Sequence, residues 1–232
     1  RPYTKKIMVI DDLADRKHDC DILLNQNLGS SKNLYKNLIP NYCDQLYGPN
    51  YALLDPAYSY ARTKLKTRMG KINVILIYFG SGKETFYLIE NILNILCEPK
   101  FVDFKINIII DDNIDDLSRI KKIIGPRKGV TIHSNLSDLS LLMLNADLAI
   151  GAGGSTTWER CCLGLPTILV ICAINQNLIG DAMKTAGAAI VLKQSNKLIS
   201  EIRDSILLFC NDNDLYLKMS KKAFSICDGN GI

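Results

Sequence analysis

The residues most suited to chemistry lie in the segment 151–166, whose sequence is Gly-Ala-Gly-Gly-Ser-Thr-Thr-Trp-Glu-Arg-Cys-Cys-Leu-Gly-Leu-Pro. Its order predicts the end of a strand, a glycine turn and then a helix that begins near Ser155. At such a turn the backbone N–H groups and the positive end of the helix can approach a phosphate. Glu159, just inside the helix, offers a carboxylate that can accept hydrogen bonds from ribose hydroxyls. The segment therefore predicts a nucleotide-binding corner with Gly153 and Gly154 at its turn.

Glu159 has a second, purely structural interpretation. The spacing Thr156-x-x-Glu159 matches a capping box, in which the glutamate returns a hydrogen bond to the start of its own helix. Spacing alone does not separate this role from ribose binding. Trp158, Cys161 and Cys162 are expected to pack in the core.

A second glycine turn follows the predicted strand 74–79 and has the sequence Phe-Gly-Ser-Gly-Lys-Glu. Gly80 and Ser81 lie where a doubly wound sheet carries a phosphate-binding turn. The sequence is neither a complete G-x-G-x-x-G nor a P-loop. A tight turn in which the glycines supply a positive φ is therefore the alternative.

Two further loops are placed to reach a ligand, and each has an alternative role in helix capping. The loop 132–138 can present backbone groups to the edge of a base, or its Asn135 or Ser137 can cap the following helix. Further along, the amides of Asn175 and Gln176 can bind sugar or phosphate oxygens, or they can cap a helix.

Four carboxylates and a histidine gather in the segment 11–19, directly after the predicted strand 6–10. Asp11, Asp12 and His18 are residue types suited to a metal or an acid–base site. A charged loop at a strand exit explains the same composition, so both interpretations stay open.

The composition is that of an ordinary globular protein, with 47% apolar and 22% charged residues among 232. The net charge of +4 is small, and the basic residues are scattered apart from a cluster at 62–71 that fits a solvated linker, so no nucleic-acid partner is expected. Eight cysteines without a Cys-x-x-Cys pair, and only two histidines, predict buried thiols without a metal. No apolar run suits a membrane span or a signal peptide, which predicts a soluble cytoplasmic protein. Both ends look cut, so we expect a fragment of a longer protein.

From residue 72 onward, strand-like apolar runs alternate with helical patterns. Strands are predicted at 74–79, 106–110, 130–132, 148–150, 167–171 and 189–192. Such alternation implies right-handed βαβ units and a doubly wound parallel sheet. Short strands at 6–10 and 20–24 precede an irregular stretch from 25 to 56. We therefore predict an α/β protein with a domain remnant at 1–58, a linker at 59–71 and a Rossmann-like domain at 72–232.

Several of these segments, in this order, resemble one enzyme family. They are residues 10–27, 48–54, 78–80, 151–166 and 175–176. Together they are similar to the UDP-sugar hydrolase of pseudaminic acid biosynthesis, a family grouped with spore-coat polysaccharide proteins. Residues 154–166 are also more distantly similar to the UDP-binding helix of the N-acetylglucosaminyl transferase that makes the peptidoglycan lipid precursor.

The resemblance implies a GT-B architecture, in which two Rossmann-like domains hold a UDP-sugar in their cleft without a metal or a cofactor. It also assigns a role to individual residues, with Glu159 on the UDP ribose and Asn175 at an active-site asparagine position of the family. The other implied contacts are Gly80, Ser81, Gly153, Gly154, Ser155 and Thr156 at the diphosphate, Asn135 and Leu136 at the uracil, and Gln176 and Tyr51 near the sugar.

The implied reaction is hydrolysis of UDP-2,4-diacetamido-2,4,6-trideoxy-altrose to UDP and the free sugar by a base-activated water. The catalytic histidine of the family lies in a Gly-x-Gly-His-x-x-Arg motif that this chain lacks, and neither His18 nor His133 has that context. The chain is therefore expected to be the nucleotide-binding part of such an enzyme. Two rivals are a GT-B glycosyltransferase that uses a UDP-sugar and a non-catalytic UDP-sugar-binding module of a fused protein.

Overall fold

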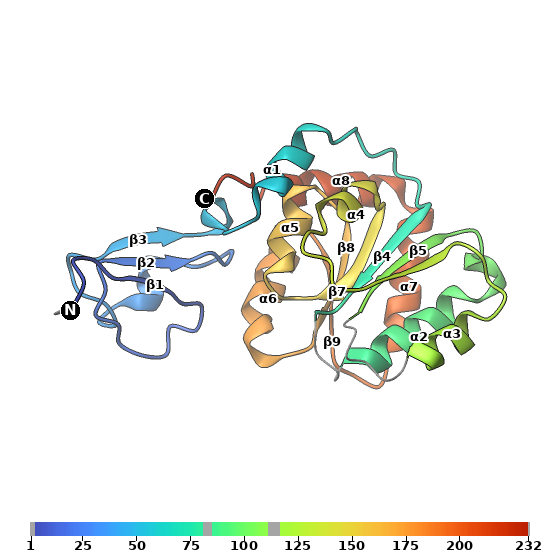
Figure 1. Ribbon diagram of the computed structural model, residues 1–232, viewed down its shortest axis with the longest axis horizontal. Helices are drawn as coiled ribbons and strands as arrows, with labels where there is room; N and C mark the ends of the chain where they lie inside the picture. The colour runs from blue at the N-terminus through green and yellow to red at the C-terminus, as the bar shows by residue number, and fades with distance from the viewer. Residues whose placement is uncertain (1–2, 81–84, 111–116, 232) are drawn as a thin grey trace.

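The protein contains two parallel sheets of unequal size (Figure 1). A computed structural model describes residues 3–80, 85–110 and 117–231. The smaller sheet has the order β1-β2-β3, formed by β1 (Met8–Ile10), β2 (Ile22–Asn25) and β3 (Asp44–Tyr47). The larger sheet has the order β6-β5-β4-β7-β8-β9.

The larger sheet confirms the predicted doubly wound topology. Its strands are β4 (Val74–Tyr78), β5 (Lys105–Ile109), β6 (Val130–His133), β7 (Leu148–Ala152), β8 (Thr167–Ile171) and β9 (Ile190–Lys193), all in parallel pairs. After β4, the strands β5 and β6 are added in turn on one side of it. The chain then returns and places β7 on the other side of β4. Such a reversal leaves a crevice at the carboxyl ends of the two central strands, where ligands bind in sheets of this kind.

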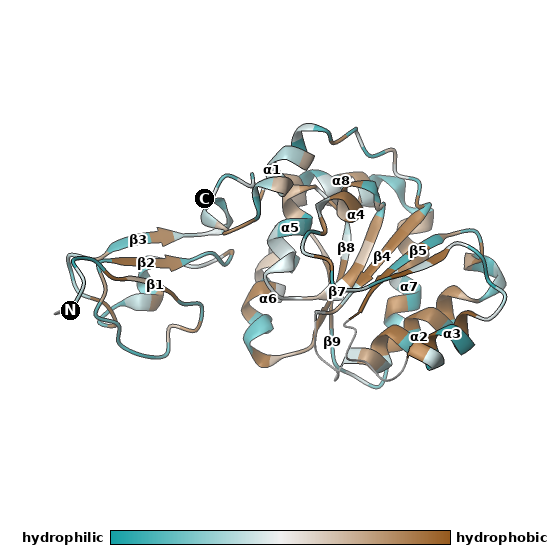
Figure 2. Ribbon diagram, in the orientation of Figure 1, coloured by the Kyte–Doolittle hydropathy of each residue, from teal (hydrophilic) through white to brown (hydrophobic). Residues whose placement is uncertain are grey.

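Helices cover both faces of the larger sheet because its strands are apolar on both sides (Figure 2). Along β4, Ile75 and Ile77 point to one face and Leu76 to the other. The first face is covered by α2 (Phe86–Leu96), α3 (Leu117–Ile124) and α7 (Leu198–Asn211). The second is covered by α4 (Ser140–Asn145), α5 (Thr156–Cys162) and α6 (Asn177–Ala186), while α8 (Asn213–Phe224) contributes to both cores.

Helix α1 (Pro56–Thr63) joins the two sheets and packs against α4 and α5. From α1, Arg62 donates to the Cys162 carbonyl at 2.6 Å and to the Cys227 carbonyl at 3.0 Å. Further along, Arg68 donates to the carbonyls of Ala146 and Leu163. These two arginines anchor the connecting segment, in contrast to the solvated linker that their basic cluster predicted. The domain boundaries at 58 and 71 stay a prediction.

The segment after α8 returns to the chain that precedes α1 (Figure 1). Cys227 Sγ donates to the Pro49 carbonyl at 3.3 Å. A methyl group on Gly231 would collide with the backbone of residues 51–52, which shows how closely the two segments approach. The structure therefore ties residues 49–52 to the larger unit.

The smaller sheet departs from the sequence-based expectations in two ways. Strand β3 lies inside the stretch 25–56, which the sequence predicts to be irregular. Its residues Asp-Gln-Leu-Tyr contain no apolar run that would indicate a strand, and they form one by pairing with β2. The compact apolar run 6–10 is typical of a strand in a buried parallel sheet, but Met8 and Ile10 of β1 are 48% and 60% exposed. The core on this side is small and contains Cys20, Leu23, Tyr35 and Cys43.

Gly151 is the tightest point between the two central strands. A methyl group there would collide with the Tyr78 carbonyl of β4 and with the Arg160 guanidinium. We expect Gly151→Ala to lower the free energy of unfolding by about 1–3 kcal/mol, the usual cost of overpacking, as measured by urea denaturation. Gly154→Ala is the matched control, because a methyl group at Gly154 meets no atom within 4 Å. Equal stability of the two variants would contradict this interpretation.

Candidate functional site

Gly80 and the glycine turn after β7 lie at the same edge of the larger sheet, next to its two central strands. Tyr78, the last residue of β4, pairs with Gly151 near the end of β7. Gly80 therefore lies at the same sheet edge as the turn 153–155, as the sequence predicted for a phosphate site. The φ of Gly80 is +83°, so its turn requires glycine. Ser81, the other residue expected there, lies outside the described residues.

Gly153 and Gly154, which follow β7, are glycines for different physical reasons. A methyl group on Gly153 would press on Leu169 and Ile171 at 3.1 and 3.3 Å, so packing accounts for this glycine. Gly154 has no positive φ, and a methyl group there would meet open space. Nothing in the described chain demands a glycine at this position, whereas a ligand that approaches the backbone closely would.

Glu159 does not form the capping box that its spacing allowed. Helix α5 starts at Thr156, and its N-cap residue Ser155 makes no side-chain capping hydrogen bond. Instead, Glu159 Oε2 accepts a hydrogen bond of 2.7 Å from the Tyr58 hydroxyl of α1. Burial raises the pKa of Glu159 and the nearby Asp138 adds to this, while the Tyr58 hydrogen bond and the Arg160 charge oppose it. The carboxylate is therefore held at the crevice side of α5 by a donor from a distant segment.

Arg160 places a buried cation beneath the glycine turn. The residue is 3% exposed, and its Nη2 donates to the Ala152 carbonyl at 2.7 Å and to Thr157 Oγ1 at 3.2 Å. Its Nε has no hydrogen-bond partner, and no carboxylate forms an ion pair with it within the described ranges. Burial lowers the pKa of Arg160 to about 10, so the side chain is protonated at neutral pH. This charge contributes a positive potential at the end of β7.

Gln176 supports the turn directly. Its Oε1 accepts from the backbone N–H of Cys172 at 2.9 Å and of Gly153 at 3.3 Å, which fixes the end of β8 against the turn after β7. The Gly153 N–H is thereby occupied by a side chain of the protein. Asn175 lies beside Gln176 in a short 3-10 helix, η5 (Ile174–Gln176), and is exposed.

The loop after β6 has a different cap from the one predicted. Asp138 accepts from the backbone N–H and the hydroxyl of Ser140 at 2.7 and 2.8 Å, so neither Asn135 nor Ser137 is the capping residue of α4. Asn135 has a φ of +51°, and Leu136 beside it is exposed. Both lie at the same carboxyl edge of the sheet as the glycine turns.

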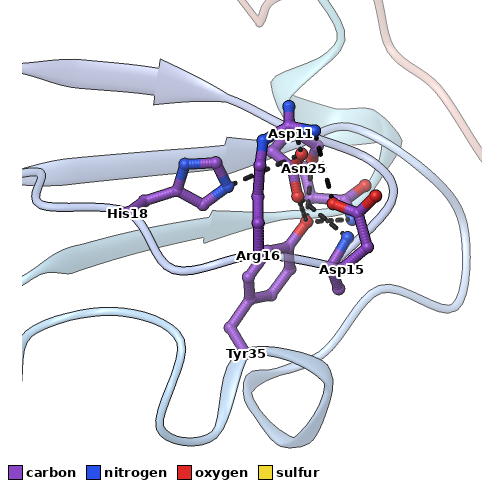
Figure 3. Close-up of polar contacts among 7 residues, drawn as sticks. Asp11, Asp15, Arg16, His18, Asn25 and Tyr35 are labelled. Atoms are coloured by element: carbon purple, nitrogen blue, oxygen red, sulfur yellow. Dashed lines mark hydrogen bonds and ion pairs between the residues drawn. The ribbon is translucent and has the colours of Figure 1, made fainter.

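The acidic segment after β1 forms a buried polar network (Figure 3). Asp11 accepts from the Ala14 N–H and the Tyr35 hydroxyl, both at 2.9 Å, and Asn25 Nδ2 donates to Tyr35 at 3.0 Å. Burial alone would raise the pKa of Asp11, but these hydrogen bonds and the nearby charges lower it below its usual value. His18 Nε2 lies 3.6 Å from the same carboxylate. The network fixes the loop at the carboxyl end of the smaller sheet.

A metal site is one of the interpretations that the sequence leaves open for the segment 11–19. Across residues 3–80, 85–110 and 117–231, no cluster of three or more His, Cys, Asp or Glu side chains is arranged to hold a metal ion. All eight cysteines are free thiols, and five of them are buried.

The predicted site residues do not all converge. Gly80, Gly153–Thr156, Gln176, Asn135, Leu136 and Asn175 all follow strands at the carboxyl edge of the larger sheet, and Glu159 lies in the first turn of the helix α5 that leaves this edge. Tyr51 is apart from them, half-exposed in a short 3-10 helix, η2 (Pro49–Tyr51), after β3. A small pocket lies between the two sides: Asp12, Asn25, residues 27–30 and Leu34 line it from the smaller unit, and Leu178 and Ala182 line it from α6.

This arrangement matches a known family. The model of the glycosyltransferase family 28 C-terminal domain matches residues 76–228, which include both glycine turns, Glu159 and Gln176. The chain belongs to this family. The part of the chain that corresponds to the family 28 C-terminal domain is thus the larger sheet with the helices that cover it.

Relatives of this family-28 chain are distant. It is 24% identical over 191 residues to the spore coat polysaccharide biosynthesis protein SpsG of Bacillus subtilis, an alignment that covers 80% of this chain and 55% of that protein. The chain thus spans little more than half the length of this relative.

Solved structures show that the fold is of the GT-B type. The chain superposes on UDP-GlcNAc 2-epimerase from Neisseria meningitidis bound to UDP-GlcNAc, with a TM-score of 0.67, 17% identity and coverage of 91% of this chain and 59% of that one. It also superposes on MurG of Acinetobacter baumannii, with a TM-score of 0.59, 18% identity and coverage of 90% and 63%. Within the described residues, none of the helices has the length and apolarity needed to cross a membrane.

Sequence reasoning missed three side chains that shape the site. Tyr58 and Asp138 approach Glu159 from segments far away in sequence, and no local pattern marks either. Arg160 follows Glu159 directly, and its place among apolar helix positions was an available signal of a buried cation.

Gln176 provides a test of how the turn is held. Gln176→Leu removes the acceptor of two backbone N–H groups, so we expect the free energy of unfolding to fall by about 1–3 kcal/mol. Gln176→Glu keeps an acceptor oxygen and is the matched control. Amide hydrogen exchange should accelerate at Gly153 and Cys172 in the leucine variant. Unchanged exchange at both amides would show that another group fixes the turn.

Proposed function

We propose that this chain is the nucleotide-binding part of a UDP-sugar hydrolase of nonulosonic acid biosynthesis, of the kind that acts in the pseudaminic acid pathway. The observation that carries the proposal is an open glycine, Gly154, at the turn after the central strand β7 of a glycosyltransferase family 28 C-terminal domain, followed by a helix in which the Glu159 carboxylate is held by Tyr58. The similarity to SpsG along 80% of the chain and the GT-B fold support it.

The candidate residues along the carboxyl edge of the larger sheet occur in an order that suits the ribose, diphosphate and uracil of UDP. In this proposal Glu159 accepts a hydrogen bond from the ribose, and the N–H groups from Gly154 to Thr156 face the diphosphate together with the turn at Gly80. Arg160, buried beneath the glycine turn after β7, contributes a positive charge to the diphosphate site. Asn135 and Leu136 offer their backbone groups to the uracil at the outer side of the crevice.

We place the sugar of the substrate on the side of the site that faces the smaller sheet. Asn175, exposed in η5 just before α6, is the proposed contact at the reacting end, and we place the pocket between α6 and the segment 27–30 on the same side. Asn25, Asn27 and Ser30 bring polar groups to that pocket, which suits a sugar that carries hydroxyl and acetamido groups.

In the proposed reaction, a water molecule attacks the anomeric carbon of UDP-2,4-diacetamido-2,4,6-trideoxy-altrose. The bond from this carbon to the diphosphate oxygen breaks, UDP leaves with the electron pair, and a general base takes the proton of the water. The backbone dipoles of the glycine turns and Arg160 stabilise the departing diphosphate. We assign the base to neither histidine, because His133 bonds to Asn107 at 2.9 Å between two strands and neither His18 nor His133 lies in a Gly-x-Gly-His context.

A glycosyltransferase is the second candidate, and the family-28 match favours it. It would use the same UDP site but pass the sugar to an acceptor other than water. A binding module without catalysis is the third, and the absence of a Gly-x-Gly-His motif from the sequence favours it.

UDP binding tests the site. We expect Glu159→Ala to weaken UDP binding about tenfold or more, because a hydrogen bond to a charged group contributes about 1.5–3 kcal/mol, and Gly154→Ala to weaken it while leaving thermal stability unchanged. Isothermal titration calorimetry measures both. Glu201→Ala in α7, on the opposite face of the sheet, is the control and should bind UDP normally. Wild-type affinity in the Glu159 variant would refute the ribose role.

The reaction products separate the candidates. A protein that joins this chain to a segment with the Gly-x-Gly-His-x-x-Arg motif should release UDP and free sugar from the UDP-linked diacetamido sugar, as followed by phosphorus and proton NMR. The chain alone should bind this substrate but turn it over at least about 100-fold more slowly, because it lacks the base. Release that requires an added sugar or lipid acceptor would favour the transferase.

A further inference from the structure

Tyr58 is the one side chain that the structure shows donating to the Glu159 carboxylate among the described residues. The two residues are 101 positions apart in the chain, and their oxygen atoms are 2.7 Å apart. Tyr58 belongs to α1, in the segment that connects the two sheets, and is only 4% exposed. A hydrogen bond to a carboxylate in such a site is stronger than one in water.

The surroundings of Glu159 raise its pKa on balance, and the hydrogen bond from Tyr58 is the largest influence that opposes this rise. The groups that face it are Tyr58 from α1, Arg160 from its own helix and Asp138 from the loop before α4. Asp138 repels it, and burial disfavours its ionised form. Arg160 attracts it, but this guanidinium is directed towards the Ala152 carbonyl. Tyr58 is therefore the neutral donor that both orients the carboxylate and stabilises its charge.

We propose that Tyr58 is a positioning residue for ribose recognition, whose hydroxyl holds the Glu159 carboxylate in place as an acceptor for a ribose hydroxyl. The inference rests on the proposed function, since it takes Glu159 as the ribose ligand. A carboxylate has about four acceptor positions, so the bond from Tyr58 leaves the others for the ribose. Recognition of the ribose then depends on a residue that does not touch the nucleotide.

A merely structural role for Tyr58 makes a different prediction. If the ring only filled the space between α1, α4 and α5, the loss of its hydroxyl would change stability and would affect all nucleotides alike. A positioning role instead affects the ribose hydroxyls selectively. The ratio of the affinities for UDP and 2′-deoxy-UDP is therefore the informative quantity.

The experiment compares the wild-type chain with Tyr58→Phe, Glu159→Gln and Tyr60→Phe by calorimetric titration with UDP and with 2′-deoxy-UDP. Tyr60 lies on the same helix, is 66% exposed and serves as the matched control. We expect Tyr58→Phe to lose UDP affinity about three- to tenfold, with little change for 2′-deoxy-UDP. Glu159→Gln should lose most of the preference for UDP, and Tyr60→Phe should retain it.

The pH dependence gives an independent readout. If the carboxylate is the acceptor, UDP affinity is present above the pKa of Glu159 and is lost as the pH falls through it. Removal of the Tyr58 hydroxyl takes away a stabiliser of the carboxylate and raises this pKa further, so the loss should set in at a higher pH in Tyr58→Phe. An unchanged acid limit in this variant would count against the proposal.

The outcomes separate the two proposals. If Glu159→Gln loses the preference for UDP but Tyr58→Phe keeps it, the positioning role is overturned and the UDP site stands. If Glu159→Gln also keeps the preference, the ribose role of Glu159 fails, and with it the role of Tyr58. If Tyr58→Phe weakens both nucleotides equally and unfolds at lower urea, the hydroxyl is structural.

Discussion

The close approach of β4 and β7 at Gly151 is the constraint on which the site depends. Because residue 151 has no side chain, the Tyr78 carbonyl and the Arg160 guanidinium occupy the space that a methyl group would take. The two central strands can therefore end together, with Tyr78 paired to Gly151 at the carboxyl edge of the sheet. The same approach seats a buried cation under the turn, where its charge acts on the crevice although the side chain is out of contact with solvent.

The position of Glu159 depends on how α5 packs after the glycine turn. The buried side of α5, with Trp158, Cys161 and Cys162, packs into the second core, and this sets the rotation of the helix about its axis. Glu159 then emerges towards α1 and meets Tyr58. The helix that joins the two sheets thus becomes part of the wall of the proposed nucleotide site, although it belongs to neither sheet.

The larger sheet could be predicted from sequence because each of its units carries its own signal. Apolar runs such as Val-Ile-Leu-Ile-Tyr in β4 are bounded by turn residues, and the helices between them show helical spacing. Gly153, Gly154 and Glu159 could be identified because they are neighbours in one segment. Tyr58 could not, since its partner lies 101 residues away and no local pattern encodes that contact. The same limit concealed β3, whose polar sequence forms a strand only because β2 offers it a paired edge.

The return of the segment after α8 to residues 49–52 means that the two sheets are joined by more than one run of chain. Cys227 and Gly231 fasten this stretch, and Gly229 lies against Ser59 of α1 and against Cys162. From the other side, the Leu53 N–H donates to Gln26 Oε1, just after β2, at 3.1 Å. The stretch before α1 is therefore braced by both units, and the Tyr58 hydroxyl that meets Glu159 is carried on a segment that the end of the chain helps to hold.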